Sequence, residues 1–141
     1  MINKIPVTWE ELHQDVQTLC SKIKAQGKFN KIIAISRGGL VPACIASYIL
    51  DIRNIDVVNI LSYDDDQKRT DSKIELATKI EADSKTLIID DVSDSGRTFH
   101  ILKKQYPSAV FAAVYAKEKG KDACDIFARQ IPDDWVVFPW D

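Results

Sequence analysis

Residues 86–98 of this 141-residue chain read TLIIDDVSDSGRT, and this stretch indicates the fold more clearly than any other. Its apolar, largely β-branched first half ends abruptly at Asp90 and Asp91, and a loop of small residues follows. Continuous apolar runs of this kind are typical of parallel strands that are covered on both faces. Open α/β sheets bind ligands just beyond the carboxyl ends of such strands. We therefore expect a buried central strand that delivers the polar residues Asp90 to Thr98 to a ligand site.

The polar part of this stretch contains two kinds of ligand-binding group. The residues suited to a phosphate are three hydroxyls and a glycine: Ser93, Ser95, Thr98 and Gly96. Gly96 lets the backbone approach a ligand closely, and amides at the start of a helix point toward an anion. Asp90 and Asp91 would repel a phosphate, but they suit ribose hydroxyls or a hard divalent cation. A phosphorylated ribose beside a metal ion would use both kinds of group.

The composition is that of an ordinary globular domain. Hydrophobic residues make up 45% and charged residues 28% of the chain, so wholesale disorder is not expected. The formal net charge of -2 lacks the basic excess of nucleic-acid-binding proteins. We expect neither a signal peptide nor an integral membrane segment. Cys20, Cys44 and Cys124 lie far apart without metal-binding spacing, which favours free thiols in a reducing cytoplasm.

Strand and helix patterns alternate along the chain. Thr8 and Glu11 form a capping box in front of apolar residues at helical spacing, which predicts a helix over 8–26. The further expected elements are strands at 31–36, 55–62, 73–78, 86–89 and 109–116, and helices at 40–50 and 97–105. This order predicts a single domain over residues 1–141 with an α/β fold, in which an open parallel sheet carries helices on both faces.

Two segments are set apart by their composition. Residues 63–72 are almost wholly polar, which predicts a mobile surface loop. Residues 123–141 contain a short strand and then an aromatic cluster that includes Trp135, Phe138 and Trp140. We expect this second segment to form a small C-terminal hood.

Four segments of the chain together resemble a known family. They are ISRGGLVP at 35–42, SYD at 62–64, IIDDVSDSGRT at 88–98 and WVVFPWD at 135–141. In this order they are similar to the type I phosphoribosyltransferases, most closely the bacterial xanthine-guanine members. The resemblance covers nearly the whole chain. It implies a Mg²⁺-dependent transfer of ribose 5-phosphate from phosphoribosyl diphosphate to a 6-oxopurine (guanine, xanthine or hypoxanthine), with release of pyrophosphate.

The resemblance also implies a role for particular residues. The ribose and its 5′-phosphate would be held by Asp90, Asp91, Ser93, Asp94, Ser95, Gly96, Arg97 and Thr98, with Asp91 nearest the Mg²⁺. The pyrophosphate would be held by Ser36, Arg37, Gly38 and Arg69, with a non-proline cis peptide between Ser36 and Arg37. The purine would be bound by Lys117, Trp135 and Val136. Asp94 would be the catalytic proton-transfer group, and the loop that carries Arg69 would close over the site.

The resemblance implies purine salvage by a homo-oligomer, either a dimer or a tetramer, and we expect the protein to be cytoplasmic. Two other functions stay open. One is a regulator that senses phosphoribosyl diphosphate without catalysis, and the other is a phosphoribosyltransferase that acts on a pyrimidine. The presence of four residues argues against the regulator: Asp94, Arg69, Lys117 and Trp135. The aromatic residue Trp135 also argues against the pyrimidine enzyme. Arg97 stands where the xanthine-guanine enzymes commonly carry a glycine.

Overall fold

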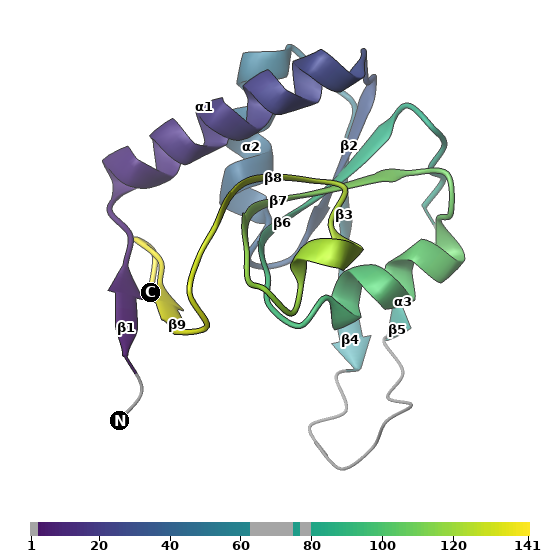
Figure 1. Ribbon diagram of the computed structural model, residues 1–141. Coiled ribbons are helices and arrows are strands. Elements are labelled where there is room, and N and C mark those ends of the chain that lie inside the picture. Colours follow the sequence, from purple (N-terminus) through teal and green to yellow (C-terminus); the bar gives the residue numbers. More distant parts are fainter. Residues whose placement is uncertain (1–2, 63–74, 77–79) are drawn as a thin grey trace.

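A computed structural model describes residues 3–62, 75–76 and 80–141, and a five-stranded parallel sheet lies at its centre (Figure 1). The strand order is β3-β2-β6-β7-β8. The strands are β2 (Lys31–Ile35), β3 (Ile55–Val58), β6 (Thr86–Ser93), β7 (Val110–Ala116) and β8 (Ile126–Gln130). All four neighbouring pairs are parallel, so the carboxyl ends of the strands meet at one edge. This confirms the predicted open parallel α/β sheet.

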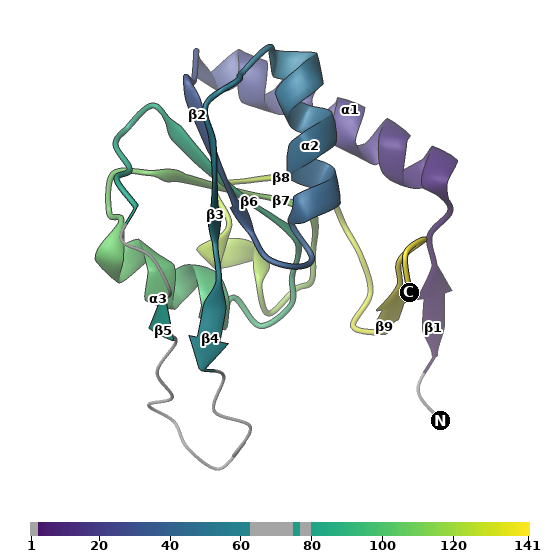
Figure 2. The same cartoon turned by 180° about the vertical axis from the view of Figure 1, so that it is seen from behind.

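Helices cover both faces of the sheet, as the views from the two sides show (Figures 1 and 2). Helices α1 (Trp9–Gln26) and α2 (Leu40–Leu50) pack on one face, and α3 (Arg97–Gln105) packs on the other. A short 3-10 turn at Lys121–Ala123 precedes β8. Among the described residues, none of the helices combines the length and the apolar character that a membrane span requires.

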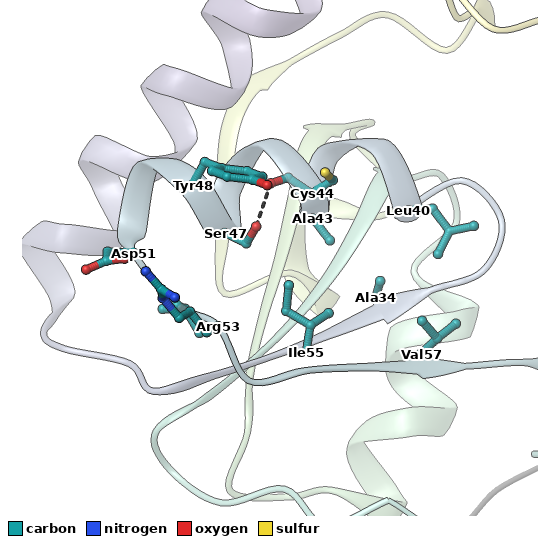
Figure 3. A pocket seen from close by; sticks show the side chains of 11 residues that line it. Ala34, Leu40, Ala43, Cys44, Ser47, Tyr48, Asp51, Arg53, Ile55 and Val57 are labelled. Atoms are coloured by element: carbon teal, nitrogen blue, oxygen red, sulfur yellow. Dashed lines mark hydrogen bonds between the residues drawn. The ribbon is translucent and has the colours of Figure 1, made fainter.

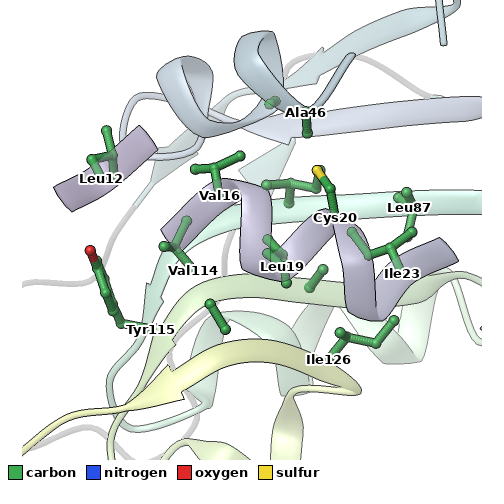
Figure 4. Close-up of a cluster of buried hydrophobic side chains, with 14 of the residues drawn as sticks. Leu12, Val16, Leu19, Cys20, Ile23, Ala46, Leu87, Val114, Tyr115 and Ile126 are labelled. Carbon is green, nitrogen blue, oxygen red and sulfur yellow. The ribbon is translucent and has the colours of Figure 1, made fainter. Parts of the chain in front are cut away.

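Helix α1 forms because its sequence supplies both a start signal and an apolar face. The Thr8 hydroxyl accepts a hydrogen bond from the Glu11 amide at 3.1 Å, and the Glu11 carboxylate accepts one from the Thr8 amide at 3.3 Å. These two bonds satisfy donors that a helix start otherwise leaves unpaired. The buried side chains recur every three or four residues (Figure 4): Leu12, Val16, Leu19, Cys20 and Ile23. The helix predicted over 8–26 is confirmed.

The central strands alternate between the two hydrophobic layers. On β2, Ile32 faces α1 and α2, whereas Ile33 belongs to the layer under α3. Side chains that alternate between two covered faces explain why the sequence of this strand is apolar throughout. In the layer under α3, the rings of Phe99 and Phe111 meet edge to face, with centroids 5.3 Å apart.

Two strands differ from their predicted limits. The strand expected over 55–62 is split, because the chain leaves the main sheet after Val58 and residues 60–62 form β4 (Ile60–Ser62). Strand β4 pairs antiparallel with β5 (Glu75–Leu76), within the strand expected at 73–78. Strand β6 was expected to end at residue 89 but runs on to Ser93, so Asp90 and Asp91 lie within it. The loop predicted over 63–72 lies outside the described residues.

A second small sheet joins the two ends of the chain. Strand β1 (Lys4–Pro6), which the sequence analysis did not predict, pairs in parallel with β9 (Trp135–Val137). This pair and the residues up to Asp141 form the hood over the carboxyl edge of the main sheet (Figure 1). The hood is narrower than the predicted range of 123–141, because β8 is the fifth strand of the main sheet.

Candidate functional site

Two neighbouring cavities lie at the carboxyl edge of the sheet. The larger has a volume of about 610 Å³ and lies between the turn after β2, the end of β6 and the hood. The smaller is a hollow of about 180 Å³ within the loop that joins β6 to α3. Val92 and Asp94 line both cavities. The predicted site residues that line one or both are Arg37, Gly38, Asp90, Asp91, Ser93, Asp94, Ser95, Gly96, Arg97, Thr98, Lys117, Trp135 and Val136.

The smaller hollow has the build of an anion site. Its loop turns into α3 at Gly96, whose φ of 83° is a left-handed conformation that favours glycine. The first amides of a helix lack carbonyl partners within the helix and carry the positive end of its dipole. Arg97 also lines this hollow, and one terminal nitrogen of its guanidinium is buried and has no hydrogen-bond partner in the described part of the chain. A phosphate would supply acceptors for these donors.

The side chain of Ser93 holds the loop in place. It is buried, and its hydroxyl donates a hydrogen bond of 2.7 Å to the carbonyl of Gly120. The hydroxyl proton of Ser93 is thus used within the protein, and a role of this residue in binding the phosphate stays a prediction. Gly120 approaches so closely that a side chain there would overlap the backbone of Ser93 and Asp94. Sequence reasoning missed Gly120, because no local pattern shows which distant backbone a glycine contacts.

Asp90 and Asp91 serve different cavities because they are neighbours on a strand. Asp90 lines the smaller hollow, and Asp91 lines the larger cavity. Each carboxylate accepts a hydrogen bond from the next amide along the chain, at 2.9 Å for Asp90 and 2.7 Å for Asp91. Burial raises the pKa of Asp90 well above its usual range, and the charge of Asp91 adds to this. Burial also raises the pKa of Asp91, and the charge of Asp141 contributes.

These two carboxylates fit a hard divalent cation in one particular way. The described residues contain no cluster of three or more His, Cys, Asp or Glu side chains that could enclose a metal by themselves. Mg²⁺ usually binds one or two carboxylates and takes its other ligands from water and substrate phosphates. Desolvated carboxylates with raised pKa values gain from a nearby cation, because it stabilises their ionised form. The acid pair therefore suits a metal that arrives together with a phosphorylated substrate.

The turn between β2 and α2 forms another wall of the larger cavity. The peptide bond between Ser36 and Arg37 is cis, as predicted. Arg37 and Gly38 line the cavity, and Gly38 lies against the carboxylate of Asp91. Ser36 lines neither cavity, and its hydroxyl donates a 2.9 Å hydrogen bond to the side-chain oxygen of Asn59. Arg69, the remaining residue predicted for this part of the site, lies outside the described residues.

A buried lysine and two acids lie where the two cavities meet the hood. Lys117 is only 6% exposed, and its ammonium lies 3.4 Å from Asp94 and 3.8 Å from Asp133. The Lys117 amide also donates a 3.0 Å hydrogen bond to the Ser93 carbonyl, which ties this residue to the end of β6. Lys117 is therefore not an ordinary surface lysine. Asp133, which no sequence pattern singled out, faces the same ammonium.

The hood presents one exposed aromatic ring to the larger cavity. Trp135 lines this cavity and is 62% exposed, so it is no core residue. Phe138 and Trp140 line the same cavity, and their rings stack on each other with centroids 4.7 Å apart. Asp141 also lines the cavity, and its carboxylate accepts a 2.9 Å hydrogen bond from the Phe138 amide. Sequence reasoning missed Asp141, although its position directly after the aromatic cluster was a signal.

Comparisons with known sequences agree with this geometry. The family model for the phosphoribosyl transferase domain matches residues 8–141. A xanthine-guanine phosphoribosyltransferase of Nitratidesulfovibrio vulgaris is 40% identical over 137 residues, which cover 96% of this chain and 83% of the relative. The enzyme of the same name from Desulfotalea psychrophila is 41% identical over 138 residues, which cover 96% of this chain and 85% of that enzyme.

Solved structures show the same fold. A purine phosphoribosyltransferase of Pyrococcus horikoshii has a TM-score of 0.81 and 28% sequence identity, and the match covers 99% of this chain and 95% of that chain. A Neisseria gonorrhoeae protein that was crystallised with bound ppGpp has a TM-score of 0.83 and 25% identity, and the match covers 100% of this chain and 90% of that chain. By sequence and by structure, this chain belongs to the phosphoribosyl transferase family.

Proposed function

We propose that this protein is a purine-salvage phosphoribosyltransferase, which transfers ribose 5-phosphate from phosphoribosyl diphosphate to a 6-oxopurine and releases pyrophosphate. The observation that carries this proposal is the pair of cavities that meet at Asp94. The smaller suits the 5′-phosphate, and the larger has the size typical of a small-molecule site. The names of the two bacterial relatives support a purine as the acceptor. The guanine nucleotide bound to the Neisseria protein supports guanine among the bases.

The smaller hollow would anchor the ribose 5-phosphate. The loop amides and the first turn of α3 would donate to the phosphate, and the buried Arg97 nitrogen would add a charged donor. Asp90, on the same hollow, would accept hydrogen bonds from the ribose hydroxyls. These contacts would fix the sugar with its anomeric carbon toward the larger cavity.

The larger cavity would hold the leaving pyrophosphate beside Arg37 and Gly38. Asp91, which lies against Gly38, would hold Mg²⁺ together with substrate oxygens and water. When bound, this ion would offset the negative charge that develops on the leaving oxygens. Arg37 is exposed and forms no ion pair within the described part of the chain, so its charge is available for the same purpose. The role of Arg69 in binding the pyrophosphate stays a prediction, because this residue lies outside the described residues.

The purine would lie under the hood. Trp135 would stack on its ring, which suits an aromatic side chain with an open face, and the backbone of Val136 would contact its edge. The Lys117 ammonium would donate to the exocyclic oxygen of a 6-oxopurine. As the bond between the sugar and pyrophosphate breaks and the bond to the purine nitrogen forms, Asp94 would take the proton from that nitrogen.

One assay tests the proposal against its alternatives. The purified protein is incubated with Mg²⁺, phosphoribosyl diphosphate and one base at a time, and nucleotide and pyrophosphate are measured. The bases are guanine, xanthine, hypoxanthine, adenine and uracil. We expect products with at least one 6-oxopurine and little with adenine or uracil. Product with uracil alone would show a pyrimidine enzyme. Binding of phosphoribosyl diphosphate without product from any base would show a sensor.

We also propose a cytoplasmic location. The three cysteines are free thiols in the structure, which fits a reducing compartment. Fractionation of cells that express the protein checks this proposal.

A further inference from the structure

The Lys117 ammonium is shared by two acids that face it from different segments of the chain. Asp94 lies in the loop after β6, and Asp133 lies in the link between β8 and β9. Their carboxylates are 3.4 Å and 3.8 Å from the ammonium. Asp94 lines both cavities and Lys117 lines the larger one, whereas Asp133 lines neither. Asp133 therefore meets the ammonium from outside the cavities and acts on a bound ligand through Lys117.

Contacts between distant segments fix Asp133 in this position. The link from β8 runs past the end of β7, because the Ile131 amide donates a 2.9 Å hydrogen bond to the carbonyl of Ala116. Ala116 directly precedes Lys117, and the Ile131 side chain is buried. The second carboxylate oxygen of Asp133 lies 3.3 Å from the ammonium of Lys119. The fold itself thus places this acid beside Lys117.

The burial of Lys117 explains why one acid is not enough for the proposed reaction. Lys117 is only 6% exposed, and a buried ammonium without a counter-charge is costly. Within the described residues, its ion pairs are those with Asp94 and Asp133. When the purine nitrogen bonds to the sugar carbon, the electron pair of the broken carbon–oxygen bond leaves with pyrophosphate, and the proton of that nitrogen passes to Asp94. Asp94 is then neutral, and Asp133 is the acid that still balances Lys117.

We propose that Asp133 is a positioning residue that keeps Lys117 paired and in place while Asp94 takes up the proton. An ammonium has three donors, so two acids hold it on two sides and leave one donor for the exocyclic oxygen of the purine. Without Asp133, proton transfer to Asp94 would leave a buried charge with no acid partner. This role rests on the proposed function, and it adds a residue that lines neither cavity.

The first test compares Asp133→Asn with the wild-type chain in single-turnover reactions with guanine, Mg²⁺ and phosphoribosyl diphosphate. Both acids are charged when the substrates bind, so Asp133 matters most once the proton moves, and its loss should affect the chemical step more than binding. We expect the rate of the chemical step to fall roughly tenfold, as for coupled members of one salt-bridge network, with little change in the affinity for either substrate. The Asp133 side chain is 61% exposed, so water screens part of its charge and the effect should stay below that of Asp94→Asn.

Three further variants show whether the charge and its position matter. Asp133→Glu keeps the charge and should restore most of the rate. Asp134→Asn removes the same charge from the next residue, which forms no ion pair within the described part of the chain. Asp51→Asn removes it beside the groove between α2 and β3, where Asp51 follows the last turn of α2 (Figure 3). We expect Asp134→Asn and Asp51→Asn to keep the wild-type rate.

The second test shows whether Asp133 acts through the proton that Asp94 takes up. The Asp94→Asn variant cannot take up this proton, so the loss of Asp133 has no such step to impair in that background. We expect Asp133→Asn to slow the wild-type chain roughly tenfold but the Asp94→Asn variant less than about threefold. A purely structural role of Asp133 would slow both by the same factor. Far-UV circular dichroism confirms that each variant is folded, and Asp133→Ser makes the same test if Asp133→Asn does not fold.

The outcomes separate this role from the proposed function. If the wild-type chain is active and Asp133→Asn reacts equally fast, the role is overturned and the proposed function stands. Equal factors in the two backgrounds, or the same loss in Asp134→Asn, would also overturn the role alone. A wild-type chain that forms no nucleotide from any 6-oxopurine would overturn the proposed function and the role of Asp133 with it.

Discussion

The carboxylate of Asp91 occupies the space in which a side chain at Gly38 would lie. Gly38 belongs to the turn after β2, and Asp91 lies on β6, which is the neighbour of β2 in the sheet. The register that pairs Ala34 with Ile89 brings the turn and the acid to the same level. The proposed pyrophosphate turn and the proposed metal-binding acid are thus positioned by direct contact with each other.

Gly38→Ala should therefore impair activity far more than stability. An added methyl group would overlap the Asp91 carboxylate, so the turn or the acid must move. Displacement by about 1 Å of groups that position a substrate can cost on the order of 100-fold in rate. We expect a loss of that order in kcat/KM for phosphoribosyl diphosphate, measured by steady-state kinetics.

The matched control is Gly27→Ala. Gly27 has a φ of 147° but no atom close to the position of a new methyl group, and it lies outside both cavities. This change should lower the free energy of unfolding by about 1 kcal/mol and leave kcat/KM unchanged. Equal losses of activity in the two variants would show that Gly38 has no special relation to Asp91.

Asp94→Asn should slow the reaction and leave the affinity for phosphoribosyl diphosphate largely intact. The amide keeps the shape of the side chain but cannot take a proton, and general-base groups contribute roughly 100-fold to 10,000-fold to a rate. Single-turnover kinetics and calorimetric binding separate the two effects. Asp133→Asn is the control, because Asp133 also faces the Lys117 ammonium. If both variants lose the same activity, pairing with Lys117 matters and proton transfer by Asp94 does not.

Asp90→Asn should stabilise the protein at neutral pH while lowering its activity. The pKa of Asp90 is raised from its ordinary value of 3.8, so the folded chain binds the proton of this group more tightly than the unfolded chain does. Its contribution to stability is therefore complete below pH 3.8 and is lost as the pH rises through the raised pKa. The asparagine side chain of Asp90→Asn does not titrate, so this variant does not lose stability in this way as the pH rises.

Urea unfolding at several pH values between the acidic and the neutral range measures this difference. The stability of the wild-type chain should fall more steeply with rising pH than that of Asp90→Asn. Asp122→Asn, at an exposed position, should leave the profile unchanged. A variant at Asp90 that is less stable than the wild type at neutral pH would contradict the raised pKa.

Two tyrosines should respond in opposite ways to loss of the hydroxyl group. The Tyr115 hydroxyl donates a 2.5 Å hydrogen bond to Asp15, which ties β7 to α1, and Asp15 also accepts one from Arg129 at 3.3 Å. Tyr115→Phe should lower the free energy of unfolding by about 1–2 kcal/mol. The buried Tyr106 hydroxyl has no partner within the described part of the chain, so Tyr106→Phe should be neutral or stabilising. Urea unfolding checks both, and destabilisation of similar size in the two variants would contradict this account.

Local signals in the sequence predicted most of the secondary structure. The helices at 40–50 and 97–105 have the predicted limits, and the capping box at Thr8 marks the start of α1. These elements were predictable because their spacing and their ends depend on neighbours in the sequence. Strand β1 was missed, because it has three residues and its partner β9 lies at the other end of the chain. The break after Val58 was also missed, because it separates strands of two different sheets.

In the candidate site, too, groups close together in the sequence were predicted, whereas contacts between distant segments were not. Residues 90–98 were predicted as a unit, and all of them except Asp91 line the smaller hollow. Ser93 was predicted to bind ligand, yet its hydroxyl contacts Gly120, which is distant in the sequence. Asp133 and Asp141 were not predicted at all, because isolated acids in the sequence carry no signal of what they face.

The sequence by itself determined the elements and the chemistry of one loop, because an apolar strand, two acids and a small-residue turn lie within thirteen consecutive positions. Only the tertiary structure decided which groups surround that loop. Parallel pairing in one register places the turn at Gly38, the end of β7 at Lys117 and the loop after β6 at a common edge. The pairing of β1 with β9 then holds Trp135 above them. These contacts depend on hydrogen bonds and packing between distant segments, which no local pattern specifies.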